Sequence, residues 1–269
     1  MNTTSKTSPL KVKSVWISDI HLGFKGCQAN SLLDFLHSVE TEYLFLVGDI
    51  VDFWSLQKTT YWPQLHTNVI RSILGKAKHG TKVIYIPGNH DAVMRDYAGM
   101  TFGNVEVHLD YVHTTAAGKK LLVLHGDEFD TIVKHSQSIA KLGSWAYERL
   151  LQVNHYVNFF RRIFKREHWS LAKYLKLKVK NAVSYIGSFE TALASLAKER
   201  HVDGVVCGHI HHAEVRYINS ILYCNDGDWV ESCSSLVEHA DGKLELLHWT
   251  DTSKQIQQSF EQNTTTKAA

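Results

Sequence analysis

The chain has 269 residues, of which 44% are hydrophobic and 21% are charged. Its 29 Lys and Arg residues nearly balance 27 Asp and Glu residues, so the net charge of +2 does not by itself indicate an acidic partner such as nucleic acid. A chain of this size can bury a large core, as one large domain or as one domain with an insertion. No run of ~18 apolar residues occurs, which excludes a membrane-spanning helix.

The cysteines and the first residues indicate the compartment. Four cysteines are present without a C-x-x-C pair, a pattern typical of reduced core thiols rather than of a disulfide framework. The first residues, MNTTSKTSPLKVK, lack the apolar segment of a secretory signal peptide. We therefore expect a cytoplasmic protein, which could still associate with a membrane surface.

Short β-branched runs alternate with amphipathic segments in the first half of the chain, a pattern that predicts an α/β fold. The predicted elements are, in chain order, strand 12–18, helix 31–39, strand 43–48, helix 69–80, and strands 82–88, 105–115 and 118–127. The last two strands lie on either side of AAGKK, which favours two packed sheets with flanking helices over a single parallel sheet.

A long helical block interrupts this pattern before strands return. Residues 132–200 contain no proline, and their leucine, tyrosine and phenylalanine residues recur at helical spacing. Strands are expected again at 202–210, 213–218, 220–226 and 243–249. The predicted domain organisation is a flexible N-terminus 1–11, a main domain 12–131 and 201–250, a helical insertion 132–200, and a flexible tail 251–269.

Two carboxylates in the stretch LVGDIVDFW follow an apolar run, where a buried strand is expected to end. An ionised Asp49 at such a place loses hydration and requires a cation, a metal or several hydrogen-bond donors. For such a stretch taken alone, the commoner explanation is that Asp49 caps a following helix and that Asp52 lies in solvent. The rest of the chain has to distinguish these alternatives.

Further polar residues follow the other predicted strands at the same kind of position. They are Asp19 and His21 in ISDIHLG, Asn89 and His90 in IPGNHDA, His125 in VLHGDE, and His209 and His211 in CGHIHHA. Because ligands bind at the carboxyl ends of strands in α/β sheets, we expect these side chains to converge.

The combination of imidazole, carboxylate and amide oxygen without thiolate suits Mn²⁺, Fe²⁺ or Zn²⁺. Even without His90, the seven such groups that include Asp49 exceed the needs of one ion, so we expect two ions with Asp49 as the bridging ligand. A pair of ions can stabilise both oxygens of an in-line phosphoryl displacement.

The ordered motifs D-x-H, G-D-x-x-D, G-N-H-D, H-G-D and G-H-x-H resemble those of the calcineurin-like metallophosphoesterase family, from Val12 to about Trp249 apart from the insertion. The resemblance implies a four-layered α/β/β/α sandwich. It also implies a first metal bound by Asp19, His21, Asp49 and His211, and a second bound by Asp49, Asn89, His125 and His209. By the same resemblance His90, beside Asn89 in the catalytic motif, binds a phosphate oxygen or protonates the leaving group.

A single histidine after an apolar run is more often a hydrogen-bonded core residue than a ligand, but five motifs in family order favour the ligand interpretation. We expect Asp52 to support a ligand rather than to bind metal. Six histidines without motif partners are expected at the surface or at helix ends: His37, His66, His79, His108, His113 and His201.

The segment 161–180, RRIFKREHWSLAKYLKLKVK, combines eight Lys or Arg residues with aromatic and aliphatic ones. One interpretation is a helical hairpin with a solvated basic face. Another is a lid that binds an amphiphile or an anionic bilayer surface. Nucleic acid would also attract these residues, but we do not expect it, because no nucleic-acid-binding motif is present. The candidate substrate-binding residues are Asn89, His90, Arg161, Arg162, Lys165 and Arg166.

Within the family, almost the whole chain resembles the bacterial branch that hydrolyses the pyrophosphate of UDP-2,3-diacylglucosamine in lipid A biosynthesis, including the segment NDGDWVESC at 225–233. His90 stands where better-described members of that branch have arginine, as in a divergent histidine-containing subgroup. The resemblance implies an amphiphilic UDP-sugar lipid substrate and peripheral association with the anionic cytoplasmic face of the inner membrane. The alternatives are a general phosphodiesterase or nucleotide phosphatase acting on soluble substrates, and a non-catalytic scaffold.

Overall fold

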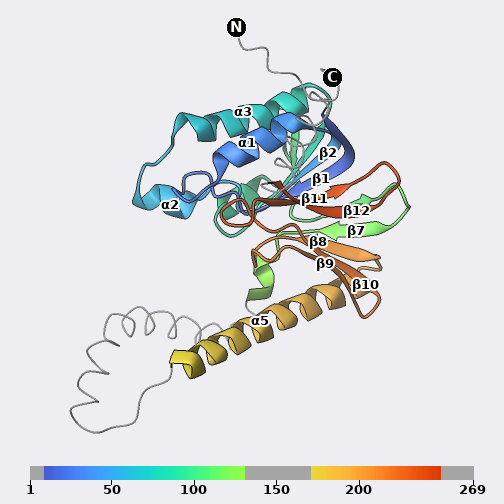
Figure 1. Cartoon of the computed structure of the whole chain (residues 1–269). Helices are drawn as coiled ribbons and strands as arrows, with labels where there is room; N and C mark the ends of the chain where they lie inside the picture. Colours follow the sequence, from blue (N-terminus) through green and yellow to red (C-terminus); the bar gives the residue numbers. More distant parts are fainter. Residues whose placement is uncertain (1–8, 131–170, 250–269) are drawn as a thin grey trace, which may run out of the picture. The chain divides into compact units, whose positions relative to one another are not determined.

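The computed structural model describes residues 9–130 and 171–249, with side chains left out at 171–184. The chain divides into two compact units, one of residues 1–127 and 194–269 and the other of residues 128–193. In Figure 1 the undescribed segments are drawn as a grey trace.

The described part of the first unit contains two β-sheets. The seven-stranded sheet has the order β12 (Leu244–His248), β11 (Ser234–Glu238), β1 (Leu10–Ile17), β2 (Val39–Val47), β3 (Lys82–Ile86), β5 (Val105–Val107) and β4 (Thr101–Phe102). The five-stranded sheet has the order β6 (Tyr111–Thr114), β7 (Lys120–Val123), β8 (Gly204–Cys207), β10 (Ile221–Asn225) and β9 (Glu214–Ile218). The central strands of both sheets are parallel, so their carboxyl ends meet at one edge of each sheet.

Helices α1 (Ala29–Ser38) and α3 (Gln64–Lys78) cover one face of the seven-stranded sheet (Figure 1). Each presents apolar residues at helical spacing to that face, for example Leu32, Phe35 and Leu36 of α1, which are buried. The remaining helical elements are α2 (Phe53–Lys58), η1 (Ala92–Tyr97), η2 (Asp127–Phe129) and α5 (Leu171–Glu199). The predicted class, mixed α/β with two sheets and helices, is confirmed.

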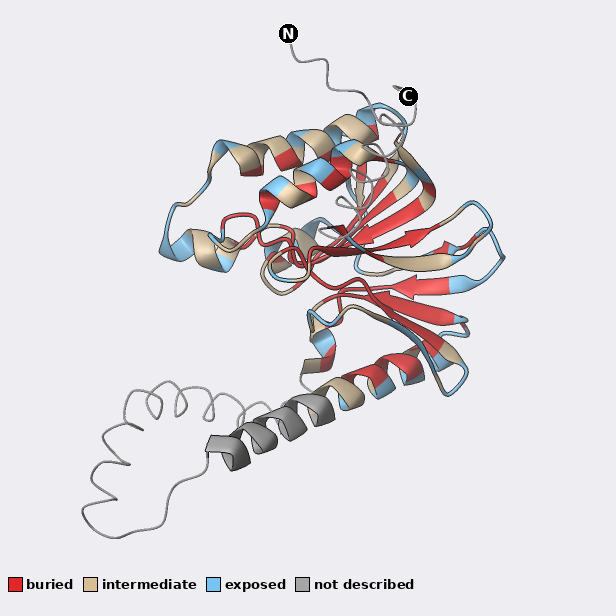
Figure 2. Cartoon of the chain, in the orientation of Figure 1, coloured by how far each residue is buried: buried red, intermediate tan, exposed pale blue. Residues whose placement is uncertain are grey.

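The two sheets pack through an apolar core formed by the inward faces of both (Figure 2). Trp16 of β1 stacks on Phe45 of β2, with ring centroids 5.2 Å apart, and both side chains are fully buried. Leu121 and Val206 belong to the same core from the other sheet. Each large apolar side chain buried in this way contributes about 1.5–3 kcal/mol to folding, so this layer holds the two sheets together.

A buried polar cluster also joins the sheets. Glu238 of β11 accepts hydrogen bonds from Ser14 of β1 at 2.7 Å and from the backbone N–H of Ala116 at 2.6 Å, and its carboxylate lies 2.8 Å from Nε2 of His113 in β6. Burial alone would raise the pKa of Glu238, but the hydrogen bonds from His113 and Ser14 lower it. The cluster therefore keeps a buried carboxylate ionised.

Several details differ from the sequence-based expectations, for example the following. The predicted strand 105–115 is two strands, β5 and β6, which belong to different sheets. His66 and His113 are buried rather than at the surface: His66 accepts the backbone N–H of Gly23, and His113 belongs to the polar cluster just described. Each has a partner far away in sequence, which no local pattern predicts.

The second unit is described at residues 128–130 and 171–193. Within it, Tyr185 of α5 donates a hydrogen bond to Asp130 at 2.8 Å, and Phe189 packs edge-on against Phe129. Residues 132–170 of the predicted insertion 132–200 lie outside the described part of the chain, so its role as a lid stays a prediction. No helix in the described residues is long and apolar enough to cross a membrane.

Replacing Glu238 with Gln is expected to lower the free energy of unfolding by about 1–3 kcal/mol at neutral pH, because a buried partner of His113 loses its charge. Since the pKa of Glu238 in the folded state lies below its ordinary value of 4.5, its contribution is present above that pH and is lost as pH falls through the folded-state value. Urea unfolding of wild type and E238Q should therefore differ at neutral pH and converge below pH 4.5.

The matched control is E245Q, because Glu245 pairs with His239 at 2.9 Å on the surface. Such exposed pairs contribute little, so E245Q should unfold like wild type at every pH. Equal stability of E238Q and wild type at neutral pH would contradict the stabilising role of the cluster.

Candidate metal centre

The candidate site lies at the carboxyl ends of five strands drawn from both sheets. Strands β1, β2 and β3 of the seven-stranded sheet and β7 and β8 of the five-stranded sheet each end just before a candidate ligand. The residues are, in chain order, Asp19 and His21 after β1, Asp49 after β2, Asn89 and His90 after β3, His125 after β7, and His209 and His211 after β8. The strand ends predicted from the sequence therefore lie at the same edges of the two sheets.

The backbone at these positions is unusual. Asp19, His21, Asp49, His209 and His211 all have positive φ angles, between 49° and 68°. Residues other than glycine rarely adopt this left-handed conformation, and it is found preferentially at functional sites. The conformation persists because backbone hydrogen bonds tie the loops together, including Asp19 N–H to Gly48 O at 3.0 Å and His21 N–H to Asp49 O at 2.9 Å.

Gly88, which has no side chain, provides the space that two candidate ligands occupy. A Cβ atom on Gly88 would overlap the Oδ1 atom of Asp49 and lie 2.6 Å from Nε2 of His125. Any larger residue would therefore displace two candidate ligands. The glycine of the G-N-H-D motif is thus required by close approach rather than by its own backbone conformation.

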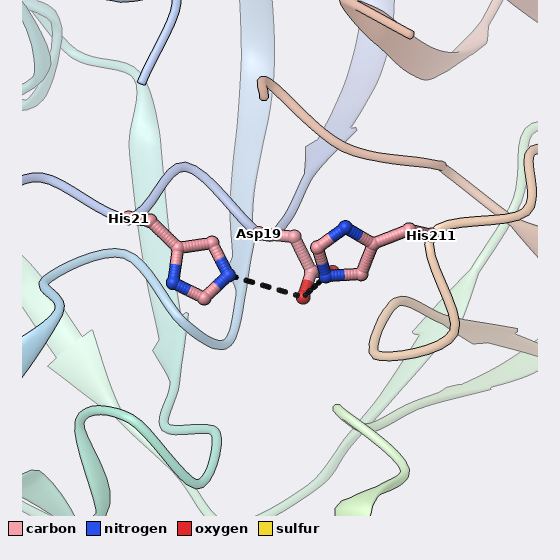
Figure 3. Close-up of side chains that lie close together, drawn as sticks. All are labelled: Asp19, His21 and His211. Atoms are coloured by element: carbon pink, nitrogen blue, oxygen red, sulfur yellow. Dashed lines mark ion pairs between the residues drawn. The ribbon is translucent and has the colours of Figure 1, made fainter. Parts of the chain in front are cut away.

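Asp19 lies between two histidines (Figure 3). Its Oδ1 atom is 3.0 Å from Nε2 of His211 and 3.9 Å from Nε2 of His21. Burial alone would raise the pKa of Asp19, but the hydrogen bond with His211 and the charge of His125 hold it below its usual range. Asp19 is therefore an ionised carboxylate with almost no access to water.

Asp49 is the second buried carboxylate. Its Oδ2 atom lies 3.5 Å from Nε2 of His125, 3.9 Å from Nε2 of His21 and 4.0 Å from Nε2 of His90, while Oδ1 accepts the backbone N–H of His90. Nδ1 of His125 donates to the backbone carbonyl of Val47 at 2.8 Å, which directs Nε2 at the carboxylate. Asp49 thus faces three imidazole nitrogens at distances too long for good hydrogen bonds.

The two buried carboxylates also affect His125. Burial alone would lower the pKa of His125, but the pairing with Asp49 and the nearby Asp19 raise it to about 10. A proton on His125 thus neutralises part of the buried negative charge. Metal binding requires neutral imidazole and would release that proton.

Asp52 orients two of the histidines. Its Oδ2 atom is 3.3 Å from Nδ1 of His21 and its Oδ1 atom is 3.0 Å from Nδ1 of His90, so both rings point Nε2 toward Asp49. The same carboxylate caps α2 by accepting the backbone N–H of Ser55 at 2.7 Å. Burial alone would raise its pKa, but the hydrogen bonds from His90 and Ser55 lower it to about 2. Both helix capping and ligand support therefore belong to Asp52, not to Asp49.

Asp91 is a supporting residue to which the sequence analysis assigned no role. Its buried carboxylate accepts the backbone N–H groups of Gly88, Asp49 and Ile50, at 2.6, 3.2 and 2.8 Å, and the hydroxyl of Tyr85. It therefore joins the loop after β2 to the loop after β3. Its place in the G-N-H-D motif was the available signal, but the motif does not show that its partners are backbone groups.

Ser18 and Asp226 are further supporting residues that the sequence analysis did not assign. The hydroxyl oxygen of Ser18 lies 2.6 Å from Oδ2 of Asp19 and 2.7 Å from Oδ1 of Asp226, and all three residues are buried. Burial raises the pKa of Asp226 well above its usual range. Asp226 lies in the NDGDW segment, where the resemblance to the family branch does not indicate this role.

These residues fit divalent cations. Among the described residues, ligand atoms within 4.8 Å of one another form three groups: Asp19, His21 and His211; His21, Asp49 and His90; and Asp19, Asp49 and His125. Two ligand atoms that bind the same ion, each at about 2.1 Å from it, lie about 3–4 Å apart. The histidine nitrogens and carboxylate oxygens of this site have that spacing. The Oδ1 atom of Asn89 is buried and has no hydrogen-bond partner in the part of the chain that the structure describes, so it is suited to bind a cation.

The structure brings together Asp19, His21, Asp49, His125 and His211. His90 lies close enough to His21 and Asp49 to be grouped with them, so its geometry suits a ligand as well as the phosphate contact expected for it. His209 contacts the site by donating its backbone N–H to Asp19 at 2.9 Å, and its ring packs edge-on against His125. The candidate substrate residues Arg161, Arg162, Lys165 and Arg166 lie outside the described residues.

The chain is similar to known proteins over most of its length. A family model described as calcineurin-like phosphoesterase matches residues 12–213. The chain is 26% identical over 235 residues to a UDP-2,3-diacylglucosamine hydrolase of Neisseria meningitidis serogroup B, covering 82% of this chain and 92% of that protein. It is 23% identical over 207 residues to the protein of the same name from Blochmanniella pennsylvanica, covering 76% and 81%.

Matches to solved structures are partial and have low sequence identity. An archaeal phosphodiesterase aligns with 87% of this chain and 98% of its own, at a TM-score of 0.41 and 11% identity.

Replacing Asp49 with Ala is expected to reduce the Mn²⁺ content of the purified protein below that of wild type by about one ion or more, because two ions would lose a shared ligand and repel each other. Metal analysis after gel filtration measures the content directly. The control is D241A, since Asp241 lies in the exposed turn between β11 and β12. Equal metal content in wild type and D49A would contradict the bridging role.

Proposed function

The chain belongs to the calcineurin-like phosphoesterase family, and on that premise we propose that it hydrolyses the pyrophosphate of UDP-2,3-diacylglucosamine to lipid X and UMP. It is a phosphoester-hydrolysing enzyme; the proposal concerns the substrate. The observation that carries it is the cluster of buried carboxylates and histidines at five strand ends, in a chain whose relatives over most of its length are named for that hydrolysis.

We propose that the cluster binds two divalent cations, Mn²⁺ in the first place, with Fe²⁺ or Zn²⁺ as alternatives. The first would be held by Asp19, His21, Asp49 and His211, and the second by Asp49, Asn89, His125 and His209. Bound cations of this kind stabilise the negative charge that develops on phosphate oxygens. The donor set of oxygen and imidazole nitrogen supports this assignment.

The chain's own residues would orient the phosphate and handle a proton. His90 is held through Nδ1 by Asp52 at 3.0 Å, so its Nε2 atom is directed at the site. In the proposed reaction a water oxygen forms the new bond to phosphorus while the bridging P–O bond breaks. Nε2 of His90 then either donates a proton to the departing oxygen or binds a phosphate oxygen.

The proposed substrate is tested with a panel. Purified protein supplied with Mn²⁺ should release UMP from detergent-dispersed UDP-2,3-diacylglucosamine at a higher kcat/KM than it hydrolyses soluble phosphodiesters or nucleotides. A preference for the soluble compounds would contradict the proposal and favour a general phosphodiesterase or nucleotide phosphatase.

Replacing His90 with Ala is expected to lower kcat by about a hundredfold, the usual scale of a general acid or of one stabilising group. Metal content should stay at the wild-type level, measured on the same samples. The control is H108A, because His108 is half exposed and pairs with Glu106 away from the site residues. Parallel loss of metal and activity in H90A would show that His90 is a ligand instead.

We also propose that the helical insertion acts as a lid that contacts the lipid and the anionic cytoplasmic face of the inner membrane. The support is the sequence of 161–180, where basic residues alternate with aromatic and aliphatic ones. Apolar residues would take acyl chains at about 0.8 kcal/mol per buried methylene, and basic residues would meet phosphates at about 1 kcal/mol per charge.

Changing four basic residues of the insertion to Ser together, at Arg161, Arg162, Lys165 and Arg166, is expected to weaken binding to anionic vesicles and to raise KM for the lipid substrate. Binding should also weaken with salt, since it is electrostatic. Vesicle sedimentation and steady-state kinetics measure the two effects. Hydrolysis of a small chromogenic phosphodiester should change little.

The matched control changes four exposed basic residues of the first unit to Ser: Lys58, Arg71, Lys78 and Lys243. It removes the same charge without touching the insertion, so vesicle binding should persist. Equal loss in both variants would mean that total charge, not the insertion, attracts the membrane.

A further inference from the structure

Helix α2 carries an exposed aromatic side chain beside the candidate site. None of its six residues is buried, and Figure 2 draws it without red. Trp54 in its first turn is 48% exposed, although it is the largest side chain of the helix. The core therefore does not account for a tryptophan at this position.

Trp54 contacts a residue of the site directly. Its ring lies 4.1 Å from the ring of His90, centroid to centroid, with the planes inclined by 34°. Nε2 of the same histidine is directed at Asp49. The exposed indole thus lies next to the place where a phosphate would bind, with only the His90 ring between them.

The position of Trp54 is fixed by the same contacts that orient His90. Asp52 caps α2 through Ser55 and also holds Nδ1 of His90, while the backbone N–H of Phe53 donates to the carbonyl of His90 at 3.2 Å. On its other side the helix packs Leu56 against Gly23, where a Cβ would lie 2.7 Å from the leucine Cγ. An exposed aromatic held in this way is preorganised for a ligand.

We propose that Trp54 is a stacking platform for the planar base of a nucleoside phosphate, and that it makes the enzyme select substrates that carry a base. The proposal rests on the proposed function in one respect, that the substrate is a nucleoside diphosphate derivative. It assigns the nucleotide half of that substrate to α2.

The surroundings of Trp54 favour a base over an acyl chain. Gln57 and Lys58, three and four residues after Trp54 on α2, are exposed and polar, so polar groups lie on the same side of the helix as the indole. An acyl chain needs continuous apolar surface, whereas a base needs one aromatic face together with polar groups at its edges. In a nucleotide the pentose ring separates the base from the phosphate. In the protein the imidazole ring of His90 similarly separates Trp54 from the candidate metal site.

The test compares two ligands that differ only in the base. Calorimetry of the Mn²⁺-supplied protein gives the Kd of UMP and of ribose 5-phosphate. Wild type should bind UMP more tightly, and W54L should raise the Kd of UMP about tenfold, the size of one stacked base. W54F, which keeps an aromatic face, should stay close to wild type. Ribose 5-phosphate should bind all three proteins equally.

The matched control is W62L. Trp62 is 38% exposed in the segment after α2, but it donates to Thr67 at 3.0 Å and packs on His66 rather than on His90. Its replacement should change neither Kd. A similar loss in W62L and W54L, a parallel loss for both ligands in W54L, or equal affinity of wild type for UMP and ribose 5-phosphate would each overturn the proposal.

The outcome is separable from that of the proposed function. A protein that prefers UMP through Trp54 but does not hydrolyse the UDP-lipid would retain the base platform and lose the lipid substrate. If wild type hydrolyses the UDP-lipid but W54L and wild type bind UMP with equal affinity, the proposed function stands and the base platform is overturned.

Discussion

The structure depends on two ionised carboxylates, Asp19 and Asp49, buried at the ends of adjacent parallel strands. Buried charge is costly unless positive charge or hydrogen-bond donors compensate it. Imidazoles surround both carboxylates, and even without a metal the pKa of His125 is raised to about 10; burial opposes this rise, and Asp49 and Asp19 cause it. The demand for positive charge thus explains the histidines, and the close approach of Asp49 and His125 to each other explains the glycine at position 88.

Because the candidate ligands come from both sheets, the packing between the sheets is also a condition of the candidate site. Asp19 and Asp49 follow strands of the seven-stranded sheet, whereas His125 and His211 follow strands of the five-stranded one. A shift of one sheet against the other would separate the carboxylates from their imidazoles. The apolar inter-sheet core and the buried Glu238 cluster, though distant in sequence from the ligands, therefore support the same function.

The candidate ligands were easier to predict from the sequence than the residues that hold them in place, and the reason is physical. Candidate ligands follow apolar strands directly, so the strand pattern places Asp49 and His125 at sheet ends before any contact is known. Asp91 and His113 act through partners set by tertiary packing: Asp91 holds backbone groups, and His113 meets a glutamate 125 positions away. The split of 105–115 into β5 and β6 has the same origin, since a local pattern does not show when a chain crosses between sheets.

Ser18 separates two buried carboxylates whose pKa values shift in opposite directions. Burial raises the pKa of Asp226 well above its usual range; burial would also raise that of Asp19, but His211 and His125 lower it. The Ser18 hydroxyl lies within 2.7 Å of both but has one proton to donate. The hydroxyl therefore links the two carboxylates and can satisfy only one of them at a time. Asp19, which faces the histidines, and Asp226 behind it are thus coupled through a single buried serine.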